Sequence, residues 1–554
     1  MTIGGGVTVT RSVADPAGRD AADRWTSATV QQSGRAAKAV GRSFDAAGRL
    51  TAQSGIGLTA AGSYGYDPVS GRKTGQSLPL ALGGAINDSY AYYAGGRLAA
   101  ATTNGSTART TFDEVGNLVG EEIADVSSTV YGYDAANRLT STATTAAVDG
   151  AAPEITYYGW DAANAWRTCQ DPDPDPTQAN SPVDFSYNAQ GRMASYANAD
   201  AATTASYAYD ASGRRTKSVV TVGGTQTTTS YDYDGLTLLS LSATQGATTW
   251  RIDYLYDEEG ALYGGVYRSP AASASPTHFT AVTDDHGDVL ELCDADGAAF
   301  AAYRYDAWGL PQGEGNCATG IWTQGTSLIT STLAGQIAAR QVLRYASYAY
   351  DAESGLYYCS ARYYDPATRQ WTSGDPAKAD GEESAYQYCG GEPVGFVDAT
   401  GFHCRRVRNE TKEDANNRVR LRLVMEWNET RVSRGLYGLQ LTLLKTGATV
   451  LRKSKFKLSR IALRFSWTPT GHCNHDGKDH RHYPHQHGQK WKVPQPVSGK
   501  TYKRWPNCSD HYNVIDAIRN NYSELQVRSR VTYFNRKTGV NDHVTLTFTW
   551  TAPD

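Results

Sequence analysis

The highest density of chemically active side chains lies near the end of the chain, in the segment HCNHDGKDHRHYPHQHG (472–488). This segment holds six of the chain's eleven histidines, together with Cys473, Asp476 and Asp479. Imidazole binds zinc and other transition metals, and it donates or accepts protons near neutral pH. A metal site here would use His475, His480, His482 and His485, and acid–base chemistry would use His480 and His482 with Asp479 or Asp476 orienting a ring.

The spacing within this segment matches no known metal motif such as HExxH. A flexible, partly protonated surface loop therefore remains an open alternative. If the segment is such a loop, His511 is the next candidate for a catalytic imidazole.

The charge of the chain changes sign near residue 402. Residues 403–554 carry 28 Lys and Arg against 12 Asp and Glu, a net charge of +16, whereas residues 1–402 carry 25 against 44, a net charge of −19. A strongly basic domain favours a polyanionic target, most simply RNA or DNA. Docking against the acidic part of the chain, or binding to an acidic membrane, would use the same charge.

The residues that must position these side chains alternate between apolar and polar. The pattern is clear in VRLRLVMEW (419–427), LQLTLL (439–444) and VTLTFTW (544–550), which predicts antiparallel strands. KTG (537–539) predicts a hairpin loop, and SDHYNVIDAIRNNY (509–522) predicts a helix capped by Ser509. Residues 403–554 are thus expected to form a small basic α+β domain.

The rest of the chain is built from one repeated unit, in which an aromatic residue is followed by Asp, two or three variable residues, then Gly or Asn and often Arg. Copies include FDAAGRL (44–50), YDPVSGR (66–72), YDAANRL (133–139), YDASGR (209–214) and YDEEGAL (256–262). In each copy Asp can cap a turn and Gly or Asn can supply its positive φ. Strand, turn and strand cannot bury a face alone, so the copies are expected to stack into one continuous sheet over residues from about 11 to 400, with the repeat shell itself at residues 1–354.

This pattern resembles the YD-repeat (Rhs) family. The resemblance is most specific at GLYYCSARYYDPATRQWTSGDP (355–376), although Arg369 and Gln370 stand where the family has Gly-Arg. It implies a mostly β fold, a partial spiral β-sheet shell that holds its own C-terminal toxin domain. Residues 355–402 would be the Rhs-associated core with its cleavage segment, and residues 403–554 the variable effector.

The resemblance also implies self-cleavage. The segment EPVGFVDATGF (392–402) corresponds to the family's cleavage segment, with Glu392 for Asn and Ala399 for Pro. On the family's pattern Arg362, Asp375 and Asp398 are the catalytic residues of an aspartyl-type peptidase, and the cut falls after Phe402 or one bond before it. Two adjacent carboxylates can divide the roles of base and acid, while Arg362 stabilises an oxyanion. Two turn-capping Asp residues and a structural Arg would fit the same residues.

The opening MTIGGGVTVTRSVADPAGRD lacks the apolar segment of a secretory signal, and no stretch has the 18 apolar residues of a membrane helix. The eight Cys contain no CxxC pair, so the redox compartment stays open. We expect a secreted or cell-surface bacterial protein that is exported by another route or is the end of a longer chain.

Three functions remain in competition. The first is a polymorphic toxin whose shell releases a basic effector, for which nuclease activity is one possible function. An immunity protein would be its partner. The second is a surface scaffold whose C-terminal β-domain binds a polyanion or glycan without enzymatic activity. The third is a silent, displaced gene cassette. A small acidic protein encoded directly downstream would favour the toxin.

Overall fold

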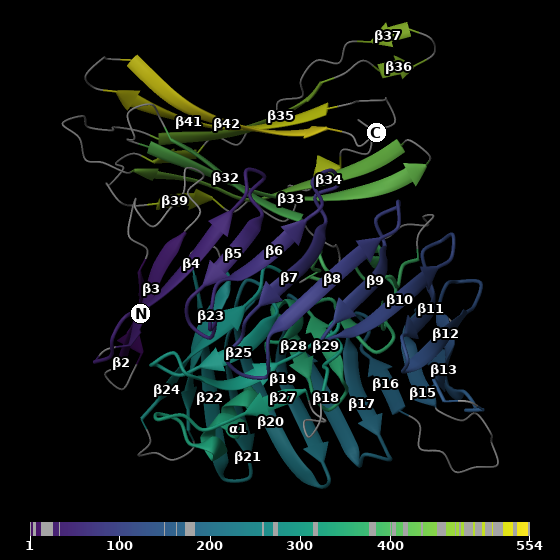
Figure 1. Ribbon diagram of the computed structural model, residues 1–554. Helices are drawn as coiled ribbons and strands as arrows, with labels where there is room; N and C mark the ends of the chain where they lie inside the picture. The colour runs from purple at the N-terminus through teal and green to yellow at the C-terminus, as the bar shows by residue number, and fades with distance from the viewer. Residues whose placement is uncertain are drawn as a thin grey trace. The chain divides into compact units, whose positions relative to one another are not determined.

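The computed structural model divides the chain into two compact units (Figure 1), one comprising residues 1–18 and 25–404 and the other residues 19–24 and 405–554. The first is described for residues 2–3, 7–12 and 26–401, with gaps at 33, 149, 162, 172–182, 258–259, 270–274, 314–319, 376–383 and 399. In the second, only the backbone of its strands between residues 406 and 551 is described.

One antiparallel sheet makes up most of the first unit, and each of its strands pairs with the next along the chain. A short strand β1 (Thr2–Ile3) pairs with its first strand. The strands of the sheet are β2 (Val7–Ser12), β3 (Ser27–Gln32), β4 (Lys38–Phe44), β5 (Leu50–Ser54), β6 (Gly62–Tyr66), β7 (Lys73–Leu78), β8 (Ile86–Tyr92), β9 (Leu98–Thr103), β10 (Ser106–Phe112), β11 (Leu118–Ile123), β12 (Ser127–Tyr133), β13 (Leu139–Ala146), β14 (Glu154–Trp160), β15 (Arg167–Asp171), β16 (Val183–Tyr187), β17 (Met193–Asn198), β18 (Thr203–Tyr209), β19 (Arg215–Val222), β20 (Thr225–Asp234), β21 (Thr237–Gln245), β22 (Thr248–Tyr256), β23 (Leu262–Arg268), β24 (Thr277–Thr283), β25 (Val289–Cys293), β26 (Ala299–Tyr303) and β27 (Ile321–Thr323). The predicted continuous sheet is confirmed as far as Thr323. Its predicted extension to about residue 400 is wrong, because residues 349–371 pair among themselves in a separate four-stranded sheet.

The predicted turns are also present, and the Asp of the repeat caps them. Asp134 Oδ1 accepts the backbone N–H of Ala136 at 2.9 Å and of Arg138 at 3.0 Å, and its Oδ2 accepts Arg138 Nε at 2.7 Å. Burial opposes ionisation of Asp134, but these donors lower the pKa of its carboxyl below the ordinary value. Asn137 supplies the positive φ of 60°. The Arg of the motif is therefore a second partner of the Asp.

The aromatic residue before the Asp ties several repeats to the one before. Where it is Tyr, its hydroxyl can donate to a backbone carbonyl at the start of the return strand of the preceding repeat, in the pairs Tyr66 to Leu50 (2.8 Å), Tyr133 to Leu118 (2.8 Å), Tyr209 to Met193 (2.7 Å) and Tyr256 to Leu238 (2.7 Å). A β-bulge lies at the same aromatic in most copies, as between Gly132 and Tyr133. Because each bulge bends and twists its strand, repeated bulges curve the sheet.

The curved sheet returns on itself, so that its early and late strands touch. Leu82, in the loop between β7 and β8, donates its backbone N–H to Glu291 Oε1 on β25 at 2.6 Å. Arg304 donates to the carbonyls of Leu82 at 2.7 Å and Gly84 at 2.8 Å. These contacts hold the loop between β7 and β8 against the late strands of the sheet.

Glu291 makes this closure sensitive to pH. Its side chain is fully buried, and burial raises the pKa of its carboxyl to about 7 from 4.5. The folded chain therefore keeps a proton that the unfolded chain releases, so the stabilisation is complete below pH 4.5 and is lost as the pH rises to about 7. Glu291→Gln should raise the free energy of unfolding at pH 8 by up to about 3 kcal/mol.

At pH 5 the same substitution should have a much smaller effect, because wild-type Glu291 is already protonated there. Thermal unfolding of both proteins at pH 5 and pH 8 measures the difference. Glu122→Gln, at an exposed position of β11, is the matched control and should change neither curve. An equal shift of Glu291→Gln at both pH values would show that the carboxyl does not titrate in this range.

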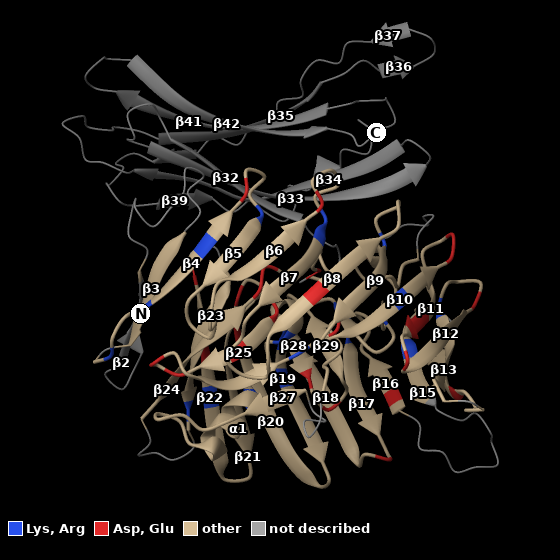
Figure 2. Ribbon diagram, in the orientation of Figure 1, with Lys and Arg blue, Asp and Glu red and all other residues tan. Residues whose placement is uncertain are grey.

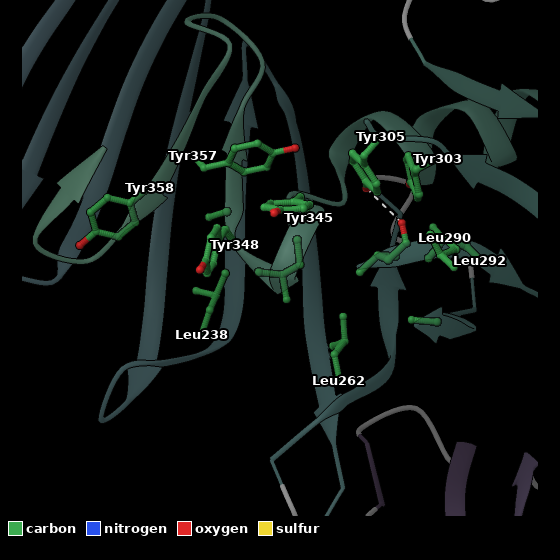
Figure 3. Packing of buried hydrophobic residues seen from close by; sticks show 14 of the residues in the cluster. Leu238, Leu262, Leu290, Leu292, Tyr303, Tyr305, Tyr345, Tyr348, Tyr357 and Tyr358 are labelled. Carbon is green, nitrogen blue, oxygen red and sulfur yellow. Dashed lines mark hydrogen bonds between the residues drawn. The ribbon is translucent and has the colours of Figure 1, made fainter. Parts of the chain in front are cut away.

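A second, smaller sheet packs against the inner side of the large one. It consists of β28 (Ala349–Asp351), β29 (Leu356–Cys359), β30 (Arg362–Asp365) and β31 (Gln370–Trp371), and almost every residue in it is buried. Before it come the helix α1 (Ser331–Arg340), capped by Thr330, and the 3₁₀ turn η1 (Tyr345–Ser347); a second 3₁₀ turn, η2 (Cys389–Gly391), follows it. Figure 3 shows the tyrosines of this region, Tyr345, Tyr348 and Tyr357, packed with leucines of the large sheet.

Buried ion pairs tie the small sheet to the large one. Arg215, the first residue of β19, pairs with both carboxylate oxygens of Asp351, one of them at 2.8 Å. Arg167 pairs with Asp365 at 2.6 Å. Figure 2 shows where acidic and basic residues lie along both sheets.

Arg369, one of the two departures from the family pattern, has a φ of 63°. This left-handed conformation favours glycine, which is the family's residue at this position. The Arg side chain is buried, and it pairs with Glu121 at 3.1 Å and Asp306 at 2.8 Å. The ion pairs offset the backbone strain that Arg introduces.

The second unit contains three antiparallel groups of strands among its described residues. The first joins β32 (Arg406–Glu413), β33 (Val419–Ser433), β34 (Leu436–Val450), β39 (Thr501–Arg504) and β40 (Tyr512–Asn513); the second joins β38 (Trp491–Val493), β35 (Ile461–Thr470), β41 (Glu524–Asn535) and β42 (Val540–Thr551); the third is the pair β36 (Cys473–His475) and β37 (Lys478–His480). The three predicted strands lie within β33, β34 and β42. β41 and β42 pair antiparallel, and the predicted loop 537–539 between them lies outside the described residues.

A helix was predicted at residues 509–522, and this prediction is wrong at the two residues of the segment that the structure describes. Tyr512 and Asn513 pair with Leu441 and Gln440 as strand β40, because pairing with a neighbouring strand overrides local helix propensity. The other residues of that segment lie outside the described residues. In the part of the chain that the structure describes, no helix is long and apolar enough to cross a membrane.

Candidate functional site

Arg362 opens β30, directly after the tight turn that joins it to β29. Cys359 pairs with Arg362 across this turn, and Ser360 takes a positive φ of 62°. Arg362 is almost fully buried, and its guanidinium lies over the ring of Trp371, with Cζ 4.1 Å from the ring centre. A cation–π contact of this kind fixes the plane of the guanidinium and leaves its edge free to donate hydrogen bonds.

The structure brings together all three residues that the family resemblance indicated. One terminal nitrogen of Arg362 donates to Asp375 Oδ2 at 3.2 Å and to Asp398 Oδ2 at 3.3 Å. The two carboxylates thus share a single guanidinium nitrogen. Asp398 is fully buried, and the side chain of Asp375 is 14% exposed.

The end of the predicted cleavage segment lies against the same arginine. Arg362 Nε donates to the carbonyl oxygen of Gly401, and the backbone N–H of Ala361 donates to the carbonyl of Thr400 at 3.1 Å. Gly401 has a φ of 68°, and a Cβ there would lie 2.7 Å from the Cys359 carbonyl oxygen. Only glycine fits this close approach. Phe402, the residue beside the predicted cut, lies outside the described residues.

Two further side chains fix Asp398, and sequence reasoning missed both. Thr400 Oγ1 donates to Asp398 Oδ1 at 3.1 Å, and the Tyr348 hydroxyl accepts the backbone N–H of Asp398. Tyr348 is buried, which raises the pKa of its phenol well above the ordinary value and keeps it neutral. Its hydroxyl also lies 3.1 Å from that of Tyr388.

This arrangement has the parts needed for peptide hydrolysis. Of the two carboxyl groups at one buried cation, one could serve as base and the other as acid. The Arg362 guanidinium already donates to the Gly401 carbonyl, the oxygen that would become negatively charged if the following bond were attacked. The contact of Arg362 with both the carboxylates and this carbonyl places acid, base and oxyanion donor at one point.

The described part of the structure does not show the histidine candidates of the second unit meeting in one site. His475 ends β36, and Asp479 and His480 end β37, which pairs with β36 so that Cys473 lies opposite His480. Their side chains, and Asp476, His482, His485 and His511 altogether, lie outside the described residues. Among the described residues no group of three His, Cys, Asp or Glu could hold a metal ion.

Comparison with known families assigns the repeat region. Residues 65–320 match the family model of the teneurin YD-shell. This range covers β7 to β26, the part of the large sheet with the capped turns and bulges described above.

Two curated relatives share short segments with this chain. The tRNA3(Ser)-specific nuclease WapA of Bacillus spizizenii is 38% identical over 120 residues, which is 21% of this chain and 4% of that protein. The double-stranded DNA deaminase toxin A of Burkholderia cenocepacia is 32% identical over 144 residues, 26% of this chain and 9% of that protein. The matches therefore span only a small part of either relative.

Among solved structures, the crystal structure of TcdB2-TccC3-TEV aligns with 71% of this chain and 20% of its own. The TM-score is 0.49 at 16% sequence identity.

Proposed function

The repeat region of this chain is a YD-repeat shell, and from that premise we propose that the chain cuts itself beside Phe402 and so releases its basic C-terminal unit as a toxic effector. The observation that carries the proposal is the meeting of Asp375, Asp398 and the Gly401 carbonyl at the Arg362 guanidinium. A structural ion pair needs one carboxylate. It does not need two carboxylates and the carbonyl of the predicted cleavage segment.

In the proposed reaction one of the two Asp carboxylates takes a proton from a water molecule. The hydroxide attacks a carbonyl carbon beside Phe402, and Arg362 stabilises the oxyanion that forms. The second Asp gives its proton to the leaving amide nitrogen, the C–N bond breaks, and a new carboxylate and a new amine result. No metal or cofactor is needed for this cleavage.

We propose that the released effector acts on nucleic acid. The net charge of +16 in residues 403–554 suits a polyanion, and the two relatives named above are, by name, a tRNA nuclease and a DNA deaminase toxin. The imidazoles of His480 and His482, with Asp479, would supply acid and base groups. The alternative set of His475, His480, His482 and His485 would hold zinc or a similar metal there.

The proposal implies export from a bacterial cell and a protective immunity protein in the producer. The competing function is a surface scaffold whose basic C-terminal unit binds a polyanion or glycan without catalysis. The two differ in what happens to a cell that contains the C-terminal unit, because only an active effector would be toxic there.

Replacing His480 and His482 together by Ala should abolish toxicity of the full chain in a bacterial host and leave its expression unchanged. The expected loss follows from removing both proposed proton-transfer groups. Growth and the integrity of cellular RNA and DNA are the measurements. His472→Ala with His487→Ala, in the same segment, is the matched control and should kill as wild type does.

If the His480 and His482 variant kills as well as wild type, the catalytic group must be another residue, and His511 would be tested first. Absence of RNA and DNA binding by the purified protein at low salt would reject a nucleic acid target. Binding without toxicity would favour the scaffold.

A further inference from the structure

His286 connects the large sheet to the cleavage segment. It lies in the turn between β24 and β25, and its side chain is almost fully buried. Its Nε2 lies 3.0 Å from the carbonyl oxygen of Phe396, only two residues before Asp398. Its Nδ1 lies 2.8 Å from Asp288 Oδ1, and that oxygen also accepts the backbone N–H of Ala346 at 2.7 Å.

The two contacts of the His286 ring require both of its nitrogens to donate. A carbonyl oxygen and an ionised carboxylate accept hydrogen bonds and do not donate them. A neutral imidazole has one N–H and can satisfy only one of these two acceptors, whereas the imidazolium satisfies both. This geometry fits the charged form of His286.

The surroundings of His286 agree with this assignment. Burial alone would lower the pKa of the ring, but the carboxylates of Asp288 and Asp284 raise it to about 9. His286 lines a small cavity together with other titratable or charged groups. They come from β7, β8, the turns after β24 and β26, and η1, and they are Lys73, Asp88, Tyr90, Asp284, Tyr305, Asp306 and Tyr345. Lys73 lies 3.9 Å from Asp284 Oδ2 and binds Asp285, so its charge is held by that pair.

The backbone before Asp398 is held at two further points. The Tyr345 hydroxyl donates to the carbonyl of Pro393 at 2.9 Å, and the Tyr345 ring lies 4.9 Å from the His286 ring. With Tyr348 on the Asp398 N–H, three side chains fix the segment 393–398. The His286 contact is the charged one, and charge-assisted hydrogen bonds are stronger than neutral ones.

We propose that His286, held in its charged form by Asp288, is a positioning residue for self-cleavage: it holds the Phe396 carbonyl and thereby keeps Asp398 against Arg362. The inference rests on the proposed function, since it concerns the same cleavage site. His286 touches no reacting atom and acts through the backbone of the segment. A displacement of about 1 Å at a catalytic group costs as much as 100-fold in rate.

The test measures the cleavage rate of the full chain after refolding, by denaturing electrophoresis over time. His286→Phe keeps an aromatic ring but no donor, and it should slow cleavage at least about tenfold. The matched control is His278→Phe on the neighbouring β24. His278 is equally buried, and neither of its ring nitrogens has a hydrogen-bond partner among the described residues. Cleavage by the control should match wild type.

A pH profile separates positioning from a general loss of structure. The ratio of the wild-type cleavage rate to that of His286→Phe cancels the pH dependence of the two Asp residues, and this ratio should fall only above about pH 9, where His286 loses its proton. Asp288→Asn removes the charge that holds this proton, so the fall should move toward the ordinary value of histidine, about 6.5. Cleavage by Asp288→Asn at pH 6 should remain close to wild type, which a misfolded variant would not achieve.

The inference is overturned if the fall at high pH occurs at the same pH in Asp288→Asn as in wild type, or if His286→Phe cleaves as fast as wild type. Either result would leave the proposed function intact. Absence of cleavage in the wild-type chain at every pH would overturn both.

Discussion

Asp398→Asn is expected to leave the chain folded and uncut. Asn keeps the shape of the side chain, and its single oxygen can still accept from one of the two donors of Asp398, the Thr400 hydroxyl or the Arg362 guanidinium. It cannot accept or give up a proton in the reaction. Because general acid–base catalysis contributes about 100- to 10,000-fold, the fragment should fall below detection on denaturing gels. Asp375→Asn should behave in the same way.

Arg362→Met should also stop cleavage, because the oxyanion donor is lost and two buried carboxylates lose their shared cation. Asp210→Asn is the control, since Asp210 caps a repeat turn and pairs with Arg214 at 2.7 Å. It should cut as wild type does. Normal cleavage by Asp398→Asn would show that this carboxylate only caps its turn.

Arg215→Met is expected to cause the largest loss of stability in the first unit. It leaves Asp351 as a buried carboxylate without its cation and removes a guanidinium that lies 4.5 to 5.2 Å from the ring centres of Tyr207, Tyr231 and Tyr358. Breaking a buried pair by removing one partner costs about 3 to 5 kcal/mol. The midpoint of urea unfolding should fall accordingly.

The neighbouring residue provides the control. Arg214 pairs with Asp210 in a repeat turn, and both side chains are about a quarter exposed. A surface pair of this kind contributes about 1 kcal/mol or less, so Arg214→Met should barely move the midpoint. Equal effects of the two substitutions would show that the Arg215 pair does not anchor the small sheet.

The repeat turns could be predicted from the sequence because every contact that defines them is local. The contacts of one turn join Asp134, Ala136 and Arg138, which lie within five residues of one another. The Asn at position 137 indicates a positive φ from its residue type alone. The turns at Asp284 and Asp294 have the same backbone hydrogen bonds but escaped prediction. Thr283 and Cys293 replace the aromatic that marks the other copies.

The cleavage residues were found through family resemblance, and their contacts could not have been derived from spacing. Arg362 and Asp398 are 36 positions apart, and only the packing of the small sheet inside the large one brings them together. The roles of His286 and Tyr348 depend on contacts 110 and 50 positions away along the chain. The one available signal was a histidine two residues after the Asp of a turn, a position where none of the recognised copies of the repeat has histidine.

Arg369 also has partners that the sequence could not predict. The sequence marks it as a departure from the family pattern, but its partners Glu121 and Asp306 lie 248 and 63 positions away. At Tyr512 the local helix pattern was overridden by pairing with β34. Local chemistry therefore predicts turns and strands, and long-range packing decides the rest.

The most direct test of self-cleavage is the mass of the wild-type polypeptides after purification under denaturing conditions. We predict two species, with the smaller one beginning at Phe402 or His403. The bond before Phe402 is favoured, because Arg362 holds the Gly401 carbonyl. A single species with the mass of the uncut chain, unchanged after prolonged incubation of the folded protein at neutral pH, would contradict the account.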